Sequence, residues 1–380
     1  MNIIADENIP SVSAAFRSMG DVRLVQGRGL TAAQVADADV LLVRSVSRVD
    51  ETLLAGSRVR FVGSATIGFD HVDLNYLRAR GIGFATAPGS NATSAAEYVV
   101  SALLVLAERN ASALAGKTVG IVGCGNVGSR VQARLAALGM QCLVNDPPRQ
   151  ASGAPGEYVD FATALQADVV TVHVPYTRTG SHATHHLFDA HAIAQLRPGA
   201  IFLNTSRGAV ADNGALLAAL RQRDDLAVVL DVWEGEPSIS MPLLERVALG
   251  TPHIAGYSLD GKLRGTEMIY QAACDFLDVA AGWDVRSVLP PALAVNLPMD
   301  EGMSPEAVVR AAVLGCYDIR ADDTRLRGML VLDAAARPGY FDRLRKQYPV
   351  RREFAATRLV GGVQRPEVRA CLAGLGFLVE

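Results

Sequence analysis

Cysteines are few in this chain, and none of them has the spacing of a metal site or a redox pair. The 380 residues contain five cysteines and no C-x-x-C motif. An odd number of scattered cysteines argues against a disulfide framework, so we expect free thiols and a reducing compartment. The cysteines are Cys124, Cys142, Cys274, Cys316 and Cys371.

Long apolar runs and a surplus of one charge are also missing. The longest largely apolar stretch, 98–107, is too short to cross a bilayer, and Asp6 comes too early for a secretory signal peptide. A net charge of −3 with 20% charged residues provides no basic field for nucleic acid. We therefore expect a cytoplasmic protein of two or three domains that acts on small molecules, with neither a membrane nor a nucleic acid as partner.

The most informative stretch begins with a short apolar run, 118–122, that opens directly into a glycine-rich turn. The turn reads G-C-G-N-V-G, the G-x-G-x-x-G spacing of a dinucleotide site. Its first glycine permits a tight turn, its second lets a pyrophosphate approach the backbone, and its third lets the next helix pack on the strand. The N–H groups of that helix would face the phosphates. The expected cofactor contacts here are Gly123, Gly125, Asn126, Val127 and Gly128.

An acidic residue completes the dinucleotide pattern. Helical periodicity over 127–138 is followed by a second apolar run, 141–145, and Asp146 stands at its end. A carboxylate at this place accepts hydrogen bonds from the ribose hydroxyls and repels a 2′-phosphate. The pattern therefore predicts NAD rather than NADP as cofactor.

Short apolar runs alternate with helical stretches along most of the chain. This alternation predicts α/β architecture, with two parallel-sheet domains and a small C-terminal α/β module. The expected strands are 2–5, 22–25, 40–43, 61–64 and 82–85 in the first domain, and 118–122, 141–145, 168–174, 200–204, 226–230 and 252–254 in the second.

Three signals set the expected domain borders. A Ser-x-x-Glu capping box over 94–97 opens a helix between the domains, and a helix over 262–281 returns the chain to the first domain. A proline-rich stretch then precedes a helix that begins at Pro305. We expect a discontinuous substrate domain (1–93 and 258–285), a nucleotide domain (94–257) and a C-terminal domain (286–380).

Three polar residues follow the later strands of the nucleotide domain. His253 has the side chain best suited to take a hydroxyl proton near neutral pH during hydride transfer from an alcohol. Glu236 can fix the tautomer of that histidine and stabilise the imidazolium. Arg207 offers a planar fork for a substrate carboxylate. Together, behind a dinucleotide motif, they predict an oxidoreductase site.

Two other clusters carry weaker signals. Four histidines gather in one stretch without an acidic or cysteine partner at ligand-like spacing, so we expect a solvated loop and no metal. Basic and aromatic residues mix over 337–358, which we interpret as a solvated face or a dimer surface. His173, at a strand end, would line the cofactor or bond a backbone carbonyl. The four clustered histidines are His182, His185, His186 and His191.

At these residues the chain resembles the D-isomer-specific 2-hydroxyacid dehydrogenase family. The likeness rests on the nucleotide segment and on the runs N-T-S-R-G, D-V-W-E-G-E-P and P-H-I-A-G. Further segments, among them M-N-I-I-A-D-E-N, A-T-I-G-F-D-H and Y-S-L-D-G-K, resemble one branch that acts on a phosphorylated hydroxy acid. The resemblance implies a Rossmann-type NAD domain, a flavodoxin-like substrate domain and a homodimer formed through the C-terminal domain.

The resemblance also implies roles for individual residues. Arg207, Glu236 and His253 would be the catalytic set, and Ser45, Thr66 and Tyr257 would contact substrate. A tyrosine at 257, where the wider family usually has a small residue, argues against a simple lactate or glycerate substrate. The remaining NAD contacts would be Asp146, Val174, Ser206, Arg207, Gly208, Asp231 and Gly256.

The sequence leaves two assignments undecided, namely the residue that binds the substrate phosphate and the exact activity. Arg44 stands beside Ser45 after the 40–43 strand and offers a second guanidinium, although it could instead brace its own domain. The alternatives to the branch named by resemblance are another phosphorylated 2-hydroxyacid dehydrogenase, such as one for 3-phosphoglycerate, and a non-enzymatic NAD-sensing scaffold of the corepressor type.

Overall fold

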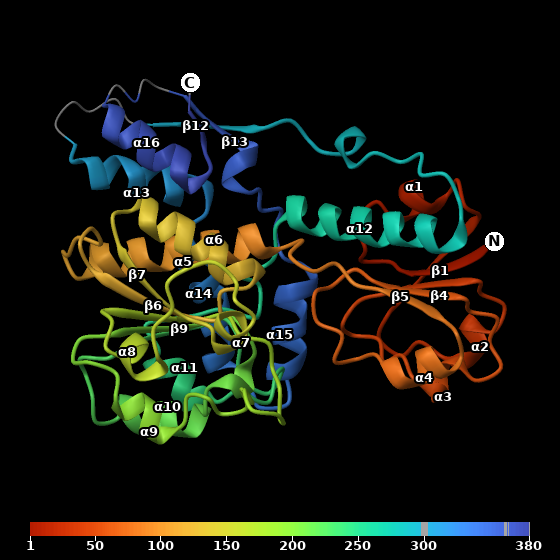
Figure 1. Cartoon of the computed structure of the whole chain (residues 1–380), viewed down its shortest axis with the longest axis horizontal. Helices are drawn as coiled ribbons and strands as arrows, with labels where there is room; N and C mark the ends of the chain where they lie inside the picture. Colours follow the sequence, from red (N-terminus) through yellow and green to blue (C-terminus); the bar gives the residue numbers. More distant parts are fainter. Residues whose placement is uncertain (298–302, 361–362, 364, 380) are drawn as a thin grey trace. The chain divides into compact units, whose positions relative to one another are not determined.

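The chain divides into two compact units. The computed structural model describes residues 1–297, 303–360, 363 and 365–379 (Figure 1). The first unit comprises Met1–Asn91 and Ser258–Pro291, and the second comprises Ala92–Tyr257 and Ala292–Glu380. The expected fold class, with two parallel-sheet α/β domains and a small C-terminal sheet, is confirmed. The C-terminal residues share the second unit, so their status as a separate domain stays a prediction.

The first unit is built on a five-stranded parallel sheet of order β2-β1-β3-β4-β5, the flavodoxin-like order. All four residues of β3 and of β4 are buried, as expected for strands covered on both faces. Its strands are β1 (Asn2–Asp6), β2 (Asp21–Val25), β3 (Val40–Val43), β4 (Phe61–Ser64) and β5 (Gly83–Ala85). Its helices are α1 (Val12–Phe16), α2 (Ala32–Val35), α3 (Glu51–Leu54), α4 (Leu74–Ala79), α12 (Leu259–Leu277) and the 3-10 helix η2 (Val285–Ser287).

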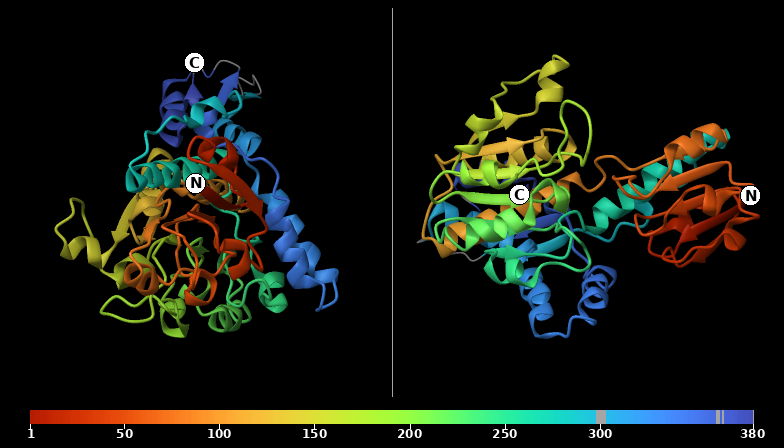
Figure 2. Two further views of the ribbon diagram at one scale, coloured as in Figure 1. Left: turned by 90° about the vertical axis from the view of Figure 1, so that its right-hand side faces the viewer. Right: turned by 90° about the horizontal axis from the view of Figure 1, so that it is seen from below.

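The helix α12 joins the first unit from far along the chain. Figures 1 and 2 show it in teal against the red and orange elements of this unit, and it packs on α1, β4 and β5. A Cβ added to Gly83 would stand 2.6 Å from the ring of Phe276, so helix and strand approach closely. The predicted return helix over 262–281 is therefore confirmed, although it begins and ends a few residues earlier.

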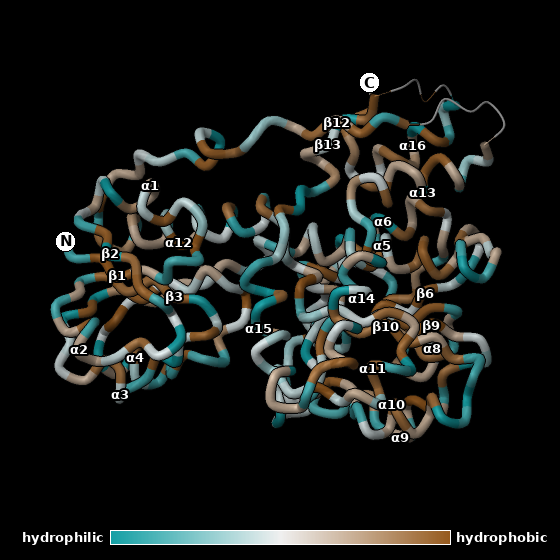
Figure 3. The backbone as a smooth tube through the Cα atoms, turned by 180° about the vertical axis from the view of Figure 1, so that it is seen from behind, coloured by the Kyte–Doolittle hydropathy of each residue, from teal (hydrophilic) through white to brown (hydrophobic). Residues whose placement is uncertain are grey.

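The second unit contains a six-stranded parallel sheet of order β11-β10-β9-β8-β6-β7. Around the labels β6, β9 and β10 the tube in Figure 3 is largely brown, hence apolar. Val159 N donates to Val144 O and Asn145 Nδ2 donates to Val159 O, both at 2.8 Å, so this segment takes the place of the outer strand of a Rossmann sheet. The strands are β6 (Thr118–Val122), β7 (Gln141–Asn145), β8 (Val169–Val172), β9 (Ile201–Asn204), β10 (Ala227–Leu230) and β11 (Leu249–Gly250).

Helices cover this sheet on both faces. They are α5 (Ala92–Arg109), α6 (Asn126–Ala137), α7 (Pro147–Ala151), α8 (Phe161–Leu165), α9 (Ala190–Ala194), α10 (Asn213–Leu220), α11 (Met241–Arg246) and the 3-10 helix η1 (Gly208–Val210). Both α5 and α6 pack on the core formed with β6.

The expected strand at 252–254 is wrong. The last strand is β11, which pairs with β10 through Val229 and Leu249. The chain then turns around the buried carboxylate of Asp231, which accepts from Ile254 N at 2.7 Å and Ala255 N at 3.0 Å. These N–H groups are therefore not available to extend the sheet.

The expected capping box over 94–97 is also wrong. The helix α5 begins at Ala92, so Ser94 and Glu97 lie inside it and both are buried. Glu97 Oε1 accepts from Phe354 N at 2.8 Å, and Oε2 lies 3.7 Å from Arg351 Nη2. Burial raises the pKa of Glu97 to about 8, against the opposing effect of Arg351. The buried position of Glu97 is therefore explained by its contacts with Phe354 and Arg351, not by a role as a helix cap.

The C-terminal residues form a three-stranded parallel sheet of order β12-β13-β14, with helices on one side. The strands are β12 (Leu293–Asn296), β13 (Thr357–Val360) and β14 (Leu378–Val379). The helices are α13 (Pro305–Cys316), α14 (Ile319–Arg327), α15 (Arg337–Lys346), α16 (Pro366–Leu375) and the 3-10 helices η3 (Gly328–Val331) and η4 (Phe354–Ala356).

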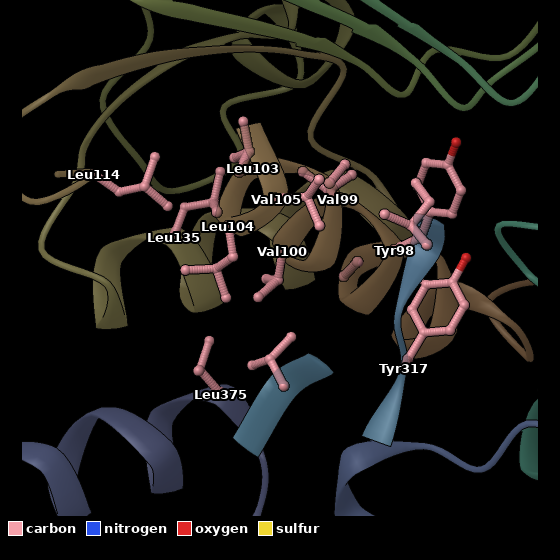
Figure 4. Close-up of a cluster of buried hydrophobic side chains, with 14 of the residues drawn as sticks. Tyr98, Val99, Val100, Leu103, Leu104, Val105, Leu114, Leu135, Tyr317 and Leu375 are labelled. Atoms are coloured by element: carbon pink, nitrogen blue, oxygen red, sulfur yellow. The ribbon is translucent and has the colours of Figure 1, made fainter. Parts of the chain in front are cut away.

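These C-terminal elements share one hydrophobic core with the nucleotide domain. Figure 4 shows Leu103 and Leu104 of α5 and Leu135 of α6 in a cluster that also includes Tyr317 and Leu375. All five side chains are at most 6% exposed. The C-terminal segment is therefore packed on the sheet of the second unit through α5 and α6.

The interpretation of 337–358 as a solvated face or dimer surface is wrong for the buried residues Phe341, 351–354 and Thr357, and stays a prediction for the rest. Phe341 and Phe354 are fully buried, and Arg351 is 6% exposed. The guanidinium carbon of Arg351 stands 3.6 Å from the centroid of the Tyr317 ring. These residues build the junction with the nucleotide domain.

Candidate active site

The glycine turn between β6 and α6 fits a dinucleotide. Gly123 has φ +88°, and a Cβ there would stand 2.9 Å from Val174 N. A Cβ on Gly128 would overlap the carbonyl oxygen of Gly123, so the helix can pack here only without a side chain. A Cβ on Gly125 would meet nothing within 4 Å. The turn is thus closed on its protein side and open at Gly125, where a pyrophosphate would approach the start of α6.

Asp146 is held at the end of β7 by two backbone groups. Its Oδ2 accepts from Cys124 N at 2.7 Å, and its Oδ1 accepts from Arg149 N at 3.1 Å. A carboxylate has about four acceptor positions, so two remain for ribose hydroxyls. The side chain is partly exposed beside the glycine turn, and its free acceptor positions fit the ribose of NAD.

His253 and Glu236 form a close pair in the second unit. His253 Nδ1 lies 2.8 Å from Glu236 Oε2, and Glu236 Oε1 accepts from Trp233 N at 2.8 Å. Burial alone would raise the pKa of Glu236, but the charges of His253 and Arg345 and the two hydrogen bonds outweigh it, and the pKa is lowered. An ionised carboxylate only accepts, so Nδ1 carries the proton and Nε2 of a neutral ring is left as a base.

The loop that carries His253 is organised by Asp231. His253 has φ +58° and donates its N–H to Asp231 O at 2.7 Å. Thr251 Oγ1 donates to Asp231 Oδ1 at 2.6 Å, so the Tyr98 hydroxyl must donate to Thr251 at 2.7 Å. This chain of hydrogen bonds holds a backbone conformation that a non-glycine residue rarely adopts. The contributions of Thr251 and Tyr98 have no signal in the sequence, because they depend on a contact between α5 and β11.

Arg207 lies on the neighbouring loop, after β9. The buried Asn204 side chain accepts from Ser206 N at 3.0 Å and donates to Arg207 O at 3.0 Å, which shapes this loop. Arg207 Nη1 donates to Ser206 O at 2.8 Å. A Cβ on Gly208 would overlap the carbonyl of Trp233. Gly208 therefore lets the Arg207 loop lie directly against the loop that carries Glu236.

The expected substrate residues fall in both units. Arg44, Ser45 and Thr66 follow the adjacent strands β3 and β4 of the first unit, whereas Tyr257 is the last residue of the 92–257 segment of the second unit. Thr66 Oγ1 donates to Gly68 O at 3.1 Å and lies 2.8 Å from Ser64 Oγ. Ser45 is exposed and Arg44 is half-buried. In the second unit, Gly256 and Val174 are both half-buried near the strand ends.

Two of the remaining histidines have structural partners. His173 lies between the hydroxyls of Thr171 and Thr205, at 2.9 and 3.1 Å, and burial lowers its pKa. His186 Nε2 lies 2.7 Å from Glu234 Oε1, an acidic partner that the sequence spacing did not indicate. Within the described ranges, no group of three His, Cys, Asp or Glu side chains could hold a metal ion. None of the described helices is long and apolar enough to span a membrane.

Comparison with known proteins defines the class. The family model for the NAD-binding domain of D-isomer specific 2-hydroxyacid dehydrogenases matches residues 92–255, and a domain of unknown function (DUF3410) matches residues 288–376. The chain belongs to this dehydrogenase family, and its cofactor is NAD. It is 49% identical to erythronate-4-phosphate dehydrogenase of Azotobacter vinelandii over 99% of both chains. It is 52% identical to the enzyme of the same name from Salinibacter ruber, over 93% of this chain and 92% of that one.

A solved structure shows the same fold. NAD⁺-bound 3-phosphoglycerate dehydrogenase of Entamoeba histolytica superposes with a TM-score of 0.63 at 23% identity, over 73% of this chain and 95% of that one. The predicted family, NAD cofactor and dehydrogenase activity are thus confirmed.

Proposed function

We propose that this enzyme oxidises 4-phospho-D-erythronate at C2 to the 2-oxo acid, a step of vitamin B6 biosynthesis. The names of relatives that match nearly its whole length support the substrate. The observation that carries the chemistry is the 2.8 Å contact between His253 and Glu236, one loop away from Arg207. The free thiols of all five cysteines suit the cytoplasm as compartment.

Each catalytic residue has one task in this proposal. Arg207 holds the substrate carboxylate and polarises the reacting oxygen. His253 Nε2 takes the proton of the C2 hydroxyl, and Glu236 stabilises the imidazolium that forms. NAD, when bound, takes up the hydride and so accepts both electrons. Ser45, Thr66 and Tyr257 are proposed to contact substrate, and the cofactor contacts named from the sequence are proposed to bind NAD.

A substrate panel followed at the NADH absorbance tests this assignment. We expect the highest kcat/KM with 4-phosphoerythronate, a lower value with unphosphorylated erythronate, and little turnover of 3-phosphoglycerate or D-lactate. A preference for 3-phosphoglycerate would replace the proposed substrate. Cofactor binding without turnover of any hydroxy acid would instead indicate an NAD-sensing scaffold.

Asp146→Ser is expected to weaken NAD binding by roughly 10- to 100-fold and to narrow its advantage over NADP. The variant loses charge-assisted hydrogen bonds and the repulsion of a 2′-phosphate. Serine is a good N-cap, so the start of α7 should persist. Dissociation constants for NADH and NADPH from fluorescence titration measure both effects. A wild-type enzyme that binds NADPH as tightly as NADH would contradict the role given to Asp146.

A homodimer formed through the C-terminal sheet is also proposed. In parallel register, Arg358 lies beside Leu378, on the side of β13 opposite the buried Leu359. The apolar side chains of Leu378 and Val360 are 50% and 41% exposed. Parallel sheets are almost always covered on both faces, so an open face of this kind supports a partner there.

Leu378→Glu is expected to shift the protein from dimer to monomer, because two glutamates would meet within an apolar contact. Light scattering coupled to size exclusion measures the mass. Leu24 on β2, which is 48% exposed, gives the matched control, and Leu24→Glu should leave the dimer intact. A Leu378→Glu protein that keeps the wild-type mass would move the interface elsewhere.

A further inference from the structure

A C-terminal arginine lies against Tyr257, one of the expected substrate residues. Arg345, in the last turn of α15, has its guanidinium carbon 5.9 Å from the centroid of the Tyr257 ring. Tyr348 meets the same ring edge-on, with centroids 5.7 Å apart and an interplanar angle of 85°. The charge of Arg345 also acts on the Glu236 carboxylate. Tyr257 thus stands beside a cation that comes from outside the nucleotide domain.

This guanidinium lacks a protein anion of its own. Its Nε is buried without a hydrogen-bond partner, and no carboxylate among the described residues forms an ion pair with Arg345. The nearest acidic groups are engaged already. Glu236 accepts from His253 and Trp233, and the Asp231 carboxylate accepts three hydrogen bonds from the 251–255 loop. Tyr257 is a hydrogen-bonding but uncharged partner of this guanidinium. A half-buried cation without an anionic partner is costly, and a bound anion would offset that cost.

Arg345 is also fixed in place and stays charged. Phe341, one turn earlier on α15, is fully buried, and the Tyr348 hydroxyl donates to Asp322 Oδ2 at 2.8 Å. Burial alone would lower the pKa of Arg345, but Tyr257, Glu236 and Asp231 outweigh it, and the pKa is raised. The guanidinium is therefore a preorganised anion site rather than a flexible surface group.

We propose that Arg345 binds the distal phosphate of the substrate and so makes the C-terminal segment part of the active site. This inference rests on the proposed function. The carboxylate end of the substrate is taken by Arg207, so the phosphate needs a separate donor, and a guanidinium offers a phosphate two parallel hydrogen bonds. Tyr257, packed between Arg345 and Tyr348, orients that fork. Arg44 of the first unit is the competing holder.

Kinetics on two substrates test the proposal. Arg345→Gln should lower kcat/KM for 4-phosphoerythronate by roughly 10- to 100-fold, mainly through KM, and should lower kcat/KM for erythronate much less, because only the effect on the Glu236 carboxylate is lost there. Arg345→Lys should recover part of the loss. Arg343→Gln is the matched control, because Arg343 is an exposed arginine on the same helix that stacks on Tyr340 at 5.2 Å. It should behave as wild type.

The outcomes separate three roles. A selective loss on the phosphorylated substrate supports phosphate binding by Arg345. An equal loss on both substrates would mean that Arg345 only positions Tyr257 or Glu236, and it would overturn the proposal. An Arg345→Gln enzyme with unchanged kcat/KM on both substrates, together with a selective loss in Arg44→Ala, would assign phosphate binding to Arg44 of the first unit. This result would also overturn the proposal.

A second readout does not depend on turnover. Inorganic phosphate should raise the Tm of the wild-type enzyme and of Arg343→Gln, but not that of Arg345→Gln, because a ligand that binds only the folded state stabilises it. If the wild type oxidises no phosphorylated acid, the proposed function fails, while this Tm comparison still decides whether Arg345 binds phosphate. Equal Tm shifts in all three proteins, or no shift in any, would overturn the inference.

Discussion

Replacing His253 by alanine is expected to lower kcat for oxidation by about 100- to 10,000-fold, the usual range for the loss of a positioned proton acceptor. NADH affinity should change little, because the ring belongs to the proton-transfer step. Glu236→Gln should cost less, since it retains a hydrogen-bonding group next to the ring. Steady-state rates at saturating substrate and NADH fluorescence titration separate chemistry from binding.

The control for this experiment is a second histidine–carboxylate pair in the same unit. His186 lies 2.7 Å from Glu234, about as close as His253 lies to Glu236. The two histidines lie on different loops, although Glu234 and Glu236 share the loop after β10. His186→Ala should keep near wild-type turnover. Oxidation requires a neutral His253 ring, whose Nε2 takes the hydroxyl proton while Glu236 holds Nδ1. A His253→Ala variant with unchanged turnover would remove His253 from the mechanism.

Gly208→Ala is expected to lower kcat/KM by at least about 100-fold, because a displacement of about 1 Å between catalytic groups has that order of effect. The added methyl would overlap the carbonyl of Trp233, which is backbone and cannot rotate away. The loops that carry Arg207 and Glu236 must therefore separate. The free energy of unfolding should also fall by about 1–3 kcal/mol, as is usual for overpacking.

Urea unfolding followed by circular dichroism measures the stability change, and the NADH assay measures the activity. Gly282→Ala provides the control, because a Cβ there would meet nothing within 4 Å. A Gly208→Ala enzyme with full activity and unchanged stability would show that the two loops are not pressed together as described.

Strands were predictable where the sequence is continuously apolar. The expected bounds at 40–43, 61–64, 118–122 and 141–145 coincide with β3, β4, β6 and β7. The strands β3 and β4 are fully buried, so their apolar composition alone marks them, whereas β7 is only partly buried and begins at the exposed Gln141. The family runs also indicated Arg207, Glu236 and His253, because each follows a strand of one sheet and the carboxyl ends of parallel strands meet at one edge.

The failures have a common physical cause, which is competition from partners distant in sequence. The Ser-x-x-Glu pattern at 94–97 has the form of a helix cap, but the buried Glu97 carboxylate instead accepts a hydrogen bond from Phe354 N. The run at 252–254 is apolar enough for a strand, but the Asp231 side chain accepts its N–H groups. The role of Arg345 was not predictable, because Arg345 and Tyr257 are almost ninety residues apart in the sequence and meet only in the fold.

The single core shared by α5, α6 and the C-terminal elements bears on how such a chain is built by evolution or by engineering. Leu103, Leu104 and Leu135 bury their side chains in the same cluster as Tyr317 and Leu375. Deleting the C-terminal segment would uncover one face of α5 and expose its leucines to solvent. A dehydrogenase without this segment would need polar residues at these positions. The segment therefore cannot be moved to another protein as an independent unit. Grafting it onto another dehydrogenase would require the surfaces of α5 and α6 to be recoded together with it.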